Sequence, residues 1–268
     1  MRVLILGEAK SGTTMLHRAI CDALGTPPEQ SFFEPEDLGE LDLDAEDLVA
    51  KKLLGNLRGS EKKLFLDFDR RVLLVRDPRD RFVSWLLYDI HGRAADLEPE
   101  KIAKFIEMLR KKEEDPSEVP FLRLTHAYWR LTGNDLLSAL ARSTARMNDL
   151  LGRFRDLFEV VQYELYVAGE SSRLEIYLGV DELGTPDVGP DLQRVVRTKG
   201  SGDWKHWFTD RDLLWLRPMV SGVLRRQGYP RDWELAEHQE IDPEHCSRYV
   251  ERLVASALDE ESAGEATD

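Results

Sequence analysis

The sequence predicts an α/β fold: a P-loop-like, mainly parallel central sheet flanked by helices, with a helical insertion in the middle. Two strand–loop–helix units, at residues 2–24 and 70–91, lead to this prediction. The third observation is a long stretch of helical character, residues 99–156. Since ligands of such sheets bind at the carboxyl ends of the strands, we expect the functional site in the loops that leave those ends.

The first unit opens with RVLILG (2–7), an aliphatic run ending in glycine that is typical of a strand buried on both faces. Residues 12–24 follow with apolar side chains at helical spacing, and Gly25 ends the predicted helix. The stretch between them, GEAKSGTT (7–14), has the glycine spacing of a phosphate-binding loop. The first unit therefore predicts a phosphate loop in the structural context that such a loop requires.

The lysine of this loop stands in an unusual place. The triphosphate loop carries its lysine after the second glycine, whereas Thr13 follows Gly12 here and Lys10 precedes it. The backbone N–H groups of Ser11 to Thr14, at a helix N-terminus, still predict an anion site. A shorter phosphate or a phosphosulfate fits this loop better than a triphosphate does.

The second unit joins two strand candidates to a helix. KKLFLDF (62–68) and RRVLLVRDP (70–78) are predicted strands, and residues 79–91 are predicted to form a helix with an apolar inner face. Asp77 is the nearest candidate for a metal-binding carboxylate, but its neighbours Arg76 and Arg79 favour an anion pocket. We therefore predict no metal site.

The rest of the chain alternates in the same way. Residues 99–156 are predicted to be helical, with breaks at EEDPSEVP (113–120) and LTGND (131–135). LFEVVQYE (157–164) is a strand candidate, followed by a helix near 172–178 and a loop at 179–190. Thr209, with Asp212 three residues on, predicts the start of a further helix.

Composition limits the class of protein. The chain has 268 residues, 42% of them hydrophobic, which is enough for one domain, 1–268, with an acidic tail from about 255 predicted to be disordered. Two cysteines give no disulfide framework, and no apolar run spans a bilayer, so we expect a reduced, soluble, cytoplasmic protein. A net charge of −14 argues against nucleic acid as a partner.

Three motifs carry a family resemblance. AKSGTTML (9–16) resembles the 5′-phosphosulfate loop of sulfotransferases that use 3′-phosphoadenosine 5′-phosphosulfate (PAPS). VLLVRDPRDRFVSW (72–85) resembles their 3′-phosphate segment, and GDWKHWFT (202–209) is similar to their C-terminal motif. VVQYELYV (160–167) is a weaker fourth match. The motifs occur in the family's order, although residues 91–156 match nothing specific.

The resemblance implies where PAPS, or its product PAP, would bind. Lys10, Ser11, Gly12, Thr13 and Thr14 would hold the 5′-phosphosulfate, and Lys10 would neutralise charge on the bridging oxygen.

For the rest of the nucleotide, the resemblance implies Arg76 and Ser84 at the 3′-phosphate, and Tyr163 near the adenine. Near the C-terminal motif, RTKGSGDW (197–204) departs from the family's R-K-G-x-x-G-D-W. Arg197, Thr198 and Lys199, with Gly200, therefore stay open as contacts of the 3′-phosphate.

Sulfuryl transfer needs a base that takes the proton of the acceptor. The cytosolic members use a histidine in a KTH stretch, but the corresponding KKLFLDFD (62–69) has none. Some carbohydrate-directed and bacterial relatives carry an EP segment, which SFFEP (31–35) resembles, so we expect Glu34 to be the base. Apolar neighbours would raise its pKa towards a useful value. His91 and Asp67 are the alternatives, while His17 and His126 are expected to be ordinary polar residues on helix faces.

The sequence thus predicts transfer of a sulfuryl group from PAPS to a hydroxyl or amine of a small-molecule or carbohydrate acceptor. A P-loop kinase for nucleotides or small molecules and a non-catalytic PAP-binding protein are the alternatives. The sequence leaves the acceptor and the oligomeric state open.

Overall fold

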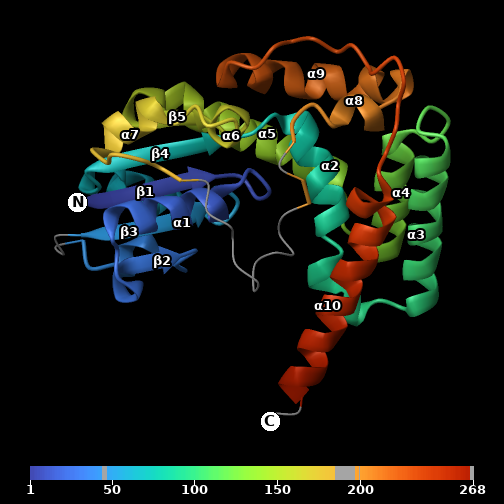
Figure 1. Ribbon diagram of the computed structural model, residues 1–268, viewed down its shortest axis with the longest axis horizontal. Coiled ribbons are helices and arrows are strands. Elements are labelled where there is room, and N and C mark those ends of the chain that lie inside the picture. The colour runs from blue at the N-terminus through green and yellow to red at the C-terminus, as the bar shows by residue number, and fades with distance from the viewer. Residues whose placement is uncertain (44–46, 185–196, 199, 266–268) are drawn as a thin grey trace. The chain divides into compact units, whose positions relative to one another are not determined.

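The computed structural model describes residues 1–43, 47–184, 197–198 and 200–265 (Figure 1). The chain divides into two compact units. The first comprises Met1–Asp77, Ala145–Gln193 and Arg226–Gly228, and the second comprises Pro78–Thr144, Arg194–Arg225 and Tyr229–Asp268.

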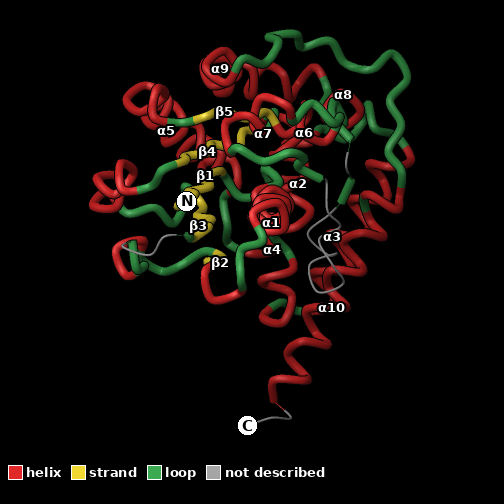
Figure 2. Tube along the Cα trace, turned by 60° about the vertical axis from the view of Figure 1, so that its left-hand side comes forward, coloured by secondary structure: helices red, strands yellow, loops and turns green. Residues whose placement is uncertain are grey.

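The core of the first unit is a five-stranded parallel sheet, which confirms the predicted α/β class. Figure 2 shows the strands side by side in the order β2-β3-β1-β4-β5. In register, Ile5 of the central strand pairs with Lys51 on one side and Val72 on the other. The strands are β1 (Arg2–Gly7), β2 (Ser31–Phe33), β3 (Leu48–Leu53), β4 (Arg70–Val75) and β5 (Glu159–Gln162).

Helices cover the sheet on both faces. Helix α1 (Thr13–Leu24) packs on β1 and β3 and ends, as predicted, at Gly25 in the left-handed conformation. On the opposite face Phe65 of the 3₁₀ helix η3 (Gly59–Asp67) lies edge-on to Phe154 of α5 (Leu136–Phe154) and to Phe158, with ring centroids 5.6 and 5.2 Å apart. The short helices α6 (Tyr163–Val167) and α7 (Ser172–Leu178) follow β5. Because both faces are covered, the strands are rich in fully buried aliphatic residues.

One predicted strand is wrong, and two real ones carry weak sequence signals. KKLFLDF (62–68) does not form a strand, because it belongs mainly to the 3₁₀ helix η3 (Gly59–Asp67), in which Phe65 is buried and Leu66 exposed. The strand beside β1 is instead β3, LVAKKL, in which two lysines interrupt the apolar pattern that predicts a buried strand. The edge strand β2 has only three residues.

The two lysines of β3 point to opposite faces of the sheet, since side chains alternate along a strand. Lys52 is buried, and its Nζ donates to Glu61 Oε1 at 2.6 Å and to the Glu36 carbonyl at 2.8 Å. Glu61 also accepts the backbone N–H groups of Leu38 and Arg58. Burial raises the pKa of Glu61, but these hydrogen bonds outweigh it and leave the pKa below its ordinary value. The acidic segment after β2 is thereby fastened to the sheet.

The described part of the second unit is helical. It contains α2 (Pro78–Tyr88), α3 (Pro99–Glu114), α4 (Phe121–Thr132), α8 (Trp204–Trp207), most of α9 (Asp210–Gln227) and α10 (Ser247–Glu265). The breaks after α3 and α4 confirm those predicted at 113–120 and 131–135. Residues 255–265 of the acidic tail, predicted to be disordered, continue α10, because Leu253 and Ala257 bury the inner face of this helix. Residues 266–268 lie outside the described residues.

Asp212 fixes two helix starts in this unit. The side chain is fully buried, and its carboxylate accepts the backbone N–H groups of Phe121 and Leu122, each at 2.8 Å. The same carboxylate accepts the N–H and the hydroxyl of Thr209, as the predicted cap requires. The N-termini of α4 and α9 are thus satisfied by one side chain.

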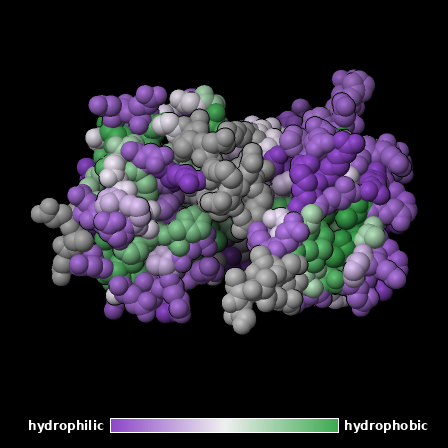
Figure 3. Space-filling model, turned by 60° about the horizontal axis from the view of Figure 1, so that its bottom comes forward, coloured by the Kyte–Doolittle hydropathy of each residue, from purple (hydrophilic) through white to green (hydrophobic). Residues whose placement is uncertain are grey.

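Figure 3 shows one face of the molecule, on which hydrophilic residues predominate and hydrophobic residues form smaller groups. Within the described ranges, no helix combines the length and the apolar character that crossing a bilayer requires.

Asp212→Ala should lower the free energy of unfolding by about 2 to 4 kcal/mol, because buried N–H groups at two helix starts lose their acceptor. Urea unfolding, followed by circular dichroism, measures the change. Asp210→Ala, an exposed aspartate two residues earlier on α9, is the matched control. Equal stability of the two variants would show that Asp212 is not the shared cap.

Candidate functional site

The loop between β1 and α1 has a backbone that few residues can adopt. Lys10 (φ 66°) and Gly12 (φ 93°) are both left-handed. A Cβ on Gly12 would lie 2.5 Å from the Tyr163 ring, so both the conformation and the space require glycine there. Ser11 donates its N–H and its hydroxyl to the Glu8 carbonyl, at 3.1 and 2.7 Å. The loop is therefore preformed by its own hydrogen bonds.

The start of α1 has the features of an anion site. The first helical hydrogen bond runs from Leu16 N to Gly12 O, and among the described residues no side chain caps the N-terminus. The first turn contains no acidic residue that would oppose an anion. Ser11 differs from the expectation, because its N–H and hydroxyl both serve the loop. The backbone of Thr13 and Thr14 remains in place for an anion.

Arg76 follows β4 and ties two loops together. Its Nη1 donates to the Lys10 carbonyl at 3.1 Å, and its guanidinium carbon lies 4.6 Å from the Tyr163 ring centroid. The side chain is buried, and its Nε–H has no hydrogen-bond partner among the described residues. A buried arginine with a spare donor at this edge of the sheet suits an anionic ligand.

Tyr163, at the start of α6, is buried between Gly12 and Arg76. Its ring thus lines the phosphate loop on the side of β5. Contact with adenine stays a prediction.

Glu34 directly follows β2 and has a backbone φ of 56°, a rare conformation for a residue with a side chain. Its N–H donates to the Lys51 carbonyl at 2.8 Å, and its carboxylate forms an ion pair with Lys51 Nζ. The sequence led us to expect apolar neighbours only. The structure places a buried cation beside this carboxylate as well, and the side chain of Glu34 itself is 29% exposed.

Lys51 is the residue of this site that sequence reasoning missed. Its side chain is 2% exposed, and its Nζ lies 3.4 Å from Thr14 Oγ1 and 3.8 Å from the Phe33 ring centroid. Burial lowers the pKa of Lys51, while the hydrogen bond and charge of Glu34 act in the opposite direction. The signal available in the sequence was a pair of lysines within an otherwise apolar segment, LVAKKL.

His17, expected to be an ordinary polar residue on a helix face, is buried. Its ring lies edge-on to Phe33, with centroids 5.8 Å apart, and its Nε2 lies 3.7 Å from Cys21 Sγ. Burial lowers the pKa of His17 to about 4, against a hydrogen bond with the Val49 backbone, and the charge of Lys51 lowers it further. His17 is therefore neutral near pH 7.

The alternative bases are Asp67 and His91. Asp67 is exposed and ends η3 just before β4, so it lies at the amino ends of the strands, whereas the phosphate loop leaves a carboxyl end. His91 belongs to the second unit, where it stacks on Tyr88 and its Nε2 lies 3.6 Å from Glu260.

The second unit holds the other predicted residues. Ser84 is buried on α2. Arg79 does not form the expected anion pocket beside Asp77, because its guanidinium packs against Trp204 and Trp233, 4.0 and 5.1 Å from their ring centroids, and donates to the Asp232 carbonyl. This arginine is a packing residue.

Asp80 organises the GDW motif, since its carboxylate accepts the N–H groups of Gly202 and Trp204 at 2.7 and 2.9 Å. Trp204, Trp207 and Phe208 are buried, as expected of packing anchors.

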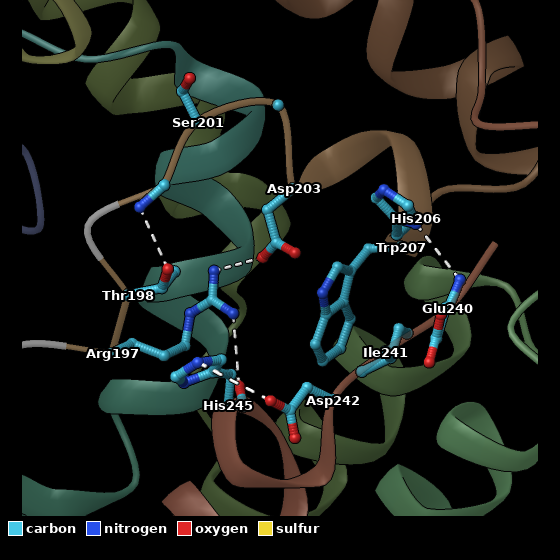
Figure 4. Close-up of a pocket in the computed structure, with 12 residues that line it drawn as sticks. Arg197, Thr198, Ser201, Asp203, His206, Trp207, Glu240, Ile241, Asp242 and His245 are labelled. Carbon is cyan, nitrogen blue, oxygen red and sulfur yellow. Dashed lines mark hydrogen bonds and ion pairs between the residues drawn. The ribbon is translucent and has the colours of Figure 1, made fainter. Parts of the chain in front are cut away.

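Arg197 lines a pocket of about 270 Å³ in the second unit (Figure 4). Its guanidinium pairs with Asp203 and donates to the His245 carbonyl. Thr198 Oγ1 accepts the N–H of Gly200 at 3.1 Å. Lys199 lies outside the described residues. The contact of this loop with a 3′-phosphate stays a prediction.

The structure thus brings together Lys10, Thr14, Arg76, Tyr163 and Glu34 within one unit. In the portion of the chain that is described, no group of three or more histidine, cysteine or acidic side chains is placed to hold a metal ion. Compared with protein-family models, curated proteins and solved structures, the chain gives no match. The sulfotransferase resemblance therefore depends on the sequence motifs alone.

The buried His17 predicts a pH-dependent stability. Since its folded pKa is about 4 and its ordinary value 6.5, protonation favours the unfolded chain. Its contribution is constant above about pH 6.5 and is lost progressively as the pH falls towards 4. Between pH 7 and about 4.5, the free energy of unfolding should fall by about 2 to 3 kcal/mol more in the wild type than in His17→Gln.

Urea unfolding at the two pH values measures this difference. His126→Gln, on the exposed face of α4, is the control and should keep the wild-type loss. An equal loss in His17→Gln and in the wild type would contradict the buried, neutral state of His17.

Proposed function

We propose that this chain is a PAPS-dependent sulfotransferase, which transfers a sulfuryl group to a hydroxyl or amine of a small-molecule or carbohydrate acceptor and releases PAP. One observation carries the proposal. Three features follow the carboxyl ends of parallel strands in one sheet: the anion loop after β1, Arg76 after β4 and Glu34 after β2. The proposed anion site and the proposed carboxylate base therefore lie at the same ends of the strands. The motifs that resemble the family supply the order and identity of these residues.

In this proposal the phosphosulfate end of PAPS binds at the N-terminus of α1, with Lys10 beside it. The helix dipole and the N–H groups of Thr13 and Thr14 favour the anion. Arg76, through its spare Nε–H, holds the 3′-phosphate, and Tyr163 lies near the adenine. Ser84, Arg197, Thr198, Lys199 and Gly200 belong to the other unit, so their contact with the 3′-phosphate rests on the sequence resemblance alone.

The reaction is a single transfer at sulfur. An acceptor oxygen or nitrogen attacks the sulfur atom, and the bond from sulfur to the bridging phosphate oxygen breaks. That oxygen leaves with the bonding electrons as part of PAP, and Lys10 stabilises its charge. Glu34 takes the proton of the acceptor.

A kinase is the second candidate, and the position of Thr13 argues against it. In a triphosphate loop that position holds the lysine that contacts the terminal phosphates, whereas Thr13 is buried here.

Isothermal titration distinguishes a sulfotransferase from a kinase. Tight binding of PAP without added metal supports a sulfotransferase, and preferential binding of ATP with Mg²⁺ favours a kinase. PAP binding without transfer of ³⁵S from labelled PAPS to any of a panel of sugars, phenols and lipids would favour a non-catalytic PAP-binding protein.

Arg76→Ala should weaken PAP binding by about 1.5 to 3 kcal/mol, because a charged hydrogen bond to phosphate is lost. Calorimetric titration measures the affinity. Arg173→Ala is the matched control. This exposed arginine pairs with Glu159 at the start of β5, so it lies at the amino ends of the strands, away from the phosphate loop. Comparable wild-type affinities for PAP and adenosine 5′-phosphate would contradict a 3′-phosphate site.

Glu34→Gln should lower turnover on the order of 10²- to 10⁴-fold, because the amide keeps the shape of the side chain and loses its basicity. Glu36→Gln changes an exposed carboxylate two residues later and should leave turnover close to that of the wild type. Transfer of ³⁵S from PAPS to the best acceptor of the panel provides the assay. Near-normal turnover of Glu34→Gln would exclude Glu34 as the base.

A further inference from the structure

We propose that Lys51 is a positioning residue whose ammonium changes partner. It pairs with Glu34 when the site is empty and with an anion when one binds at the start of α1. A phosphate or phosphosulfate bound there draws the Lys51 ammonium from the carboxylate and so releases Glu34 to accept a proton. The inference rests on the proposed function and adds a coupling between co-substrate binding and the base.

The geometry places one ammonium between two partners. Lys51 Nζ pairs with Glu34 and at the same time lies 3.4 Å from Thr14 Oγ1, in the first turn of α1. An anion held by the N–H groups of that turn therefore comes within reach of Nζ by a small rotation of the side chain. Since one ammonium has three donors, it can turn towards a doubly charged phosphate without leaving the site.

The backbone of Glu34 is anchored where β2 ends, because its N–H donates to the Lys51 carbonyl and its φ is left-handed. The ammonium of Lys51, which has four rotatable side-chain bonds, can change partner while both backbones stay in place. Phe33, whose ring lies 3.8 Å from Nζ, continues to cover the ammonium in either position. The exchange is therefore a movement of Lys51, and Glu34 stays at the strand end.

The charges around the pair favour the exchange. A buried ammonium requires a negative partner, and in the part of the chain described the buried titratable side chains of α1 are His17 and Cys21. Burial lowers the pKa of His17 and raises the pKa of the Cys21 thiol, so both are uncharged near pH 7. Lys52 points to the other face and is held by Glu61. Glu34 and the bound anion are thus the competing partners of Lys51.

A thermodynamic cycle on PAP affinity tests this coupling without an activity assay. Glu34→Gln should tighten PAP binding by about 3- to 10-fold, because the competitor for the ammonium has lost its charge. In a Lys51→Met background the same substitution should change PAP affinity by less than about 2-fold. Lys51→Met alone should weaken PAP binding, and Lys51→Arg should restore part of it.

Glu36→Gln, close in sequence but exposed, is the matched control and should leave PAP affinity unchanged in both backgrounds. Circular dichroism verifies that each variant is folded. An equal effect of Glu34→Gln with and without Lys51 would overturn the inference, because simple repulsion between Glu34 and the anion would then account for it. If Lys51→Met does not fold, Lys51→Gln takes its place in the cycle, and unchanged or weaker PAP binding by Glu34→Gln alone contradicts the competition in any case. A wild-type protein that does not bind PAP refutes the proposed function as well, whereas PAP binding without coupling refutes only the role of Lys51.

Discussion

Two adjacent lysines on a buried strand are the constraint on which the first unit depends. Lys51 and Lys52 point to opposite faces of β3, and each ammonium is removed from water at a cost of several kcal/mol unless it is paired. The ammonium of Lys52 pairs with Glu61, which also accepts a hydrogen bond from the acidic segment after β2. The ammonium of Lys51 pairs with Glu34, at the end of β2. The candidate base is therefore one of the two carboxylates that neutralise the lysines of this strand.

The second constraint is the parallel sheet, which gathers the loops of different strands at one edge. There, Arg76 and Gly12 enclose the Tyr163 ring, and the carbonyl of Lys10 is fastened to Arg76. The preformed loop reduces the ordering that an anion has to impose on binding. The hydrogen bond between Arg76 and the Lys10 carbonyl both stabilises the loop and keeps the Arg76 guanidinium close to the proposed anion site.

The arginines of the chain show how differently one residue type is used. Arg71 donates to the carbonyls of Phe65, Phe68 and Leu157, and Arg79 packs against the rings of two tryptophans. Arg197 is paired with Asp203. Arg76 and Arg197 differ from Arg71 and Arg79, because each of them retains a buried Nε–H without a partner among the described residues. Burial and partners, which a sequence does not list, separate an arginine that serves the fold from one suited to a ligand.

The sequence by itself determined the α/β class, the glycine loop, α1 with its Gly25 end, the breaks between the middle helices and the cap at Thr209, because these features depend on local periodicity and backbone conformation. Only the tertiary structure decided which apolar segment joins the sheet, since η3 and β3 compete for that role and the winner contains two charges whose partners lie far along the chain. It also decided that His17 is buried and that Asp67 lies at the amino ends of the strands, away from the phosphate loop. Above all it placed Lys51 between Glu34 and Thr14, a contact among residues 17 and 37 positions apart, because long-range packing selects the partner of a buried charge and local pattern does not.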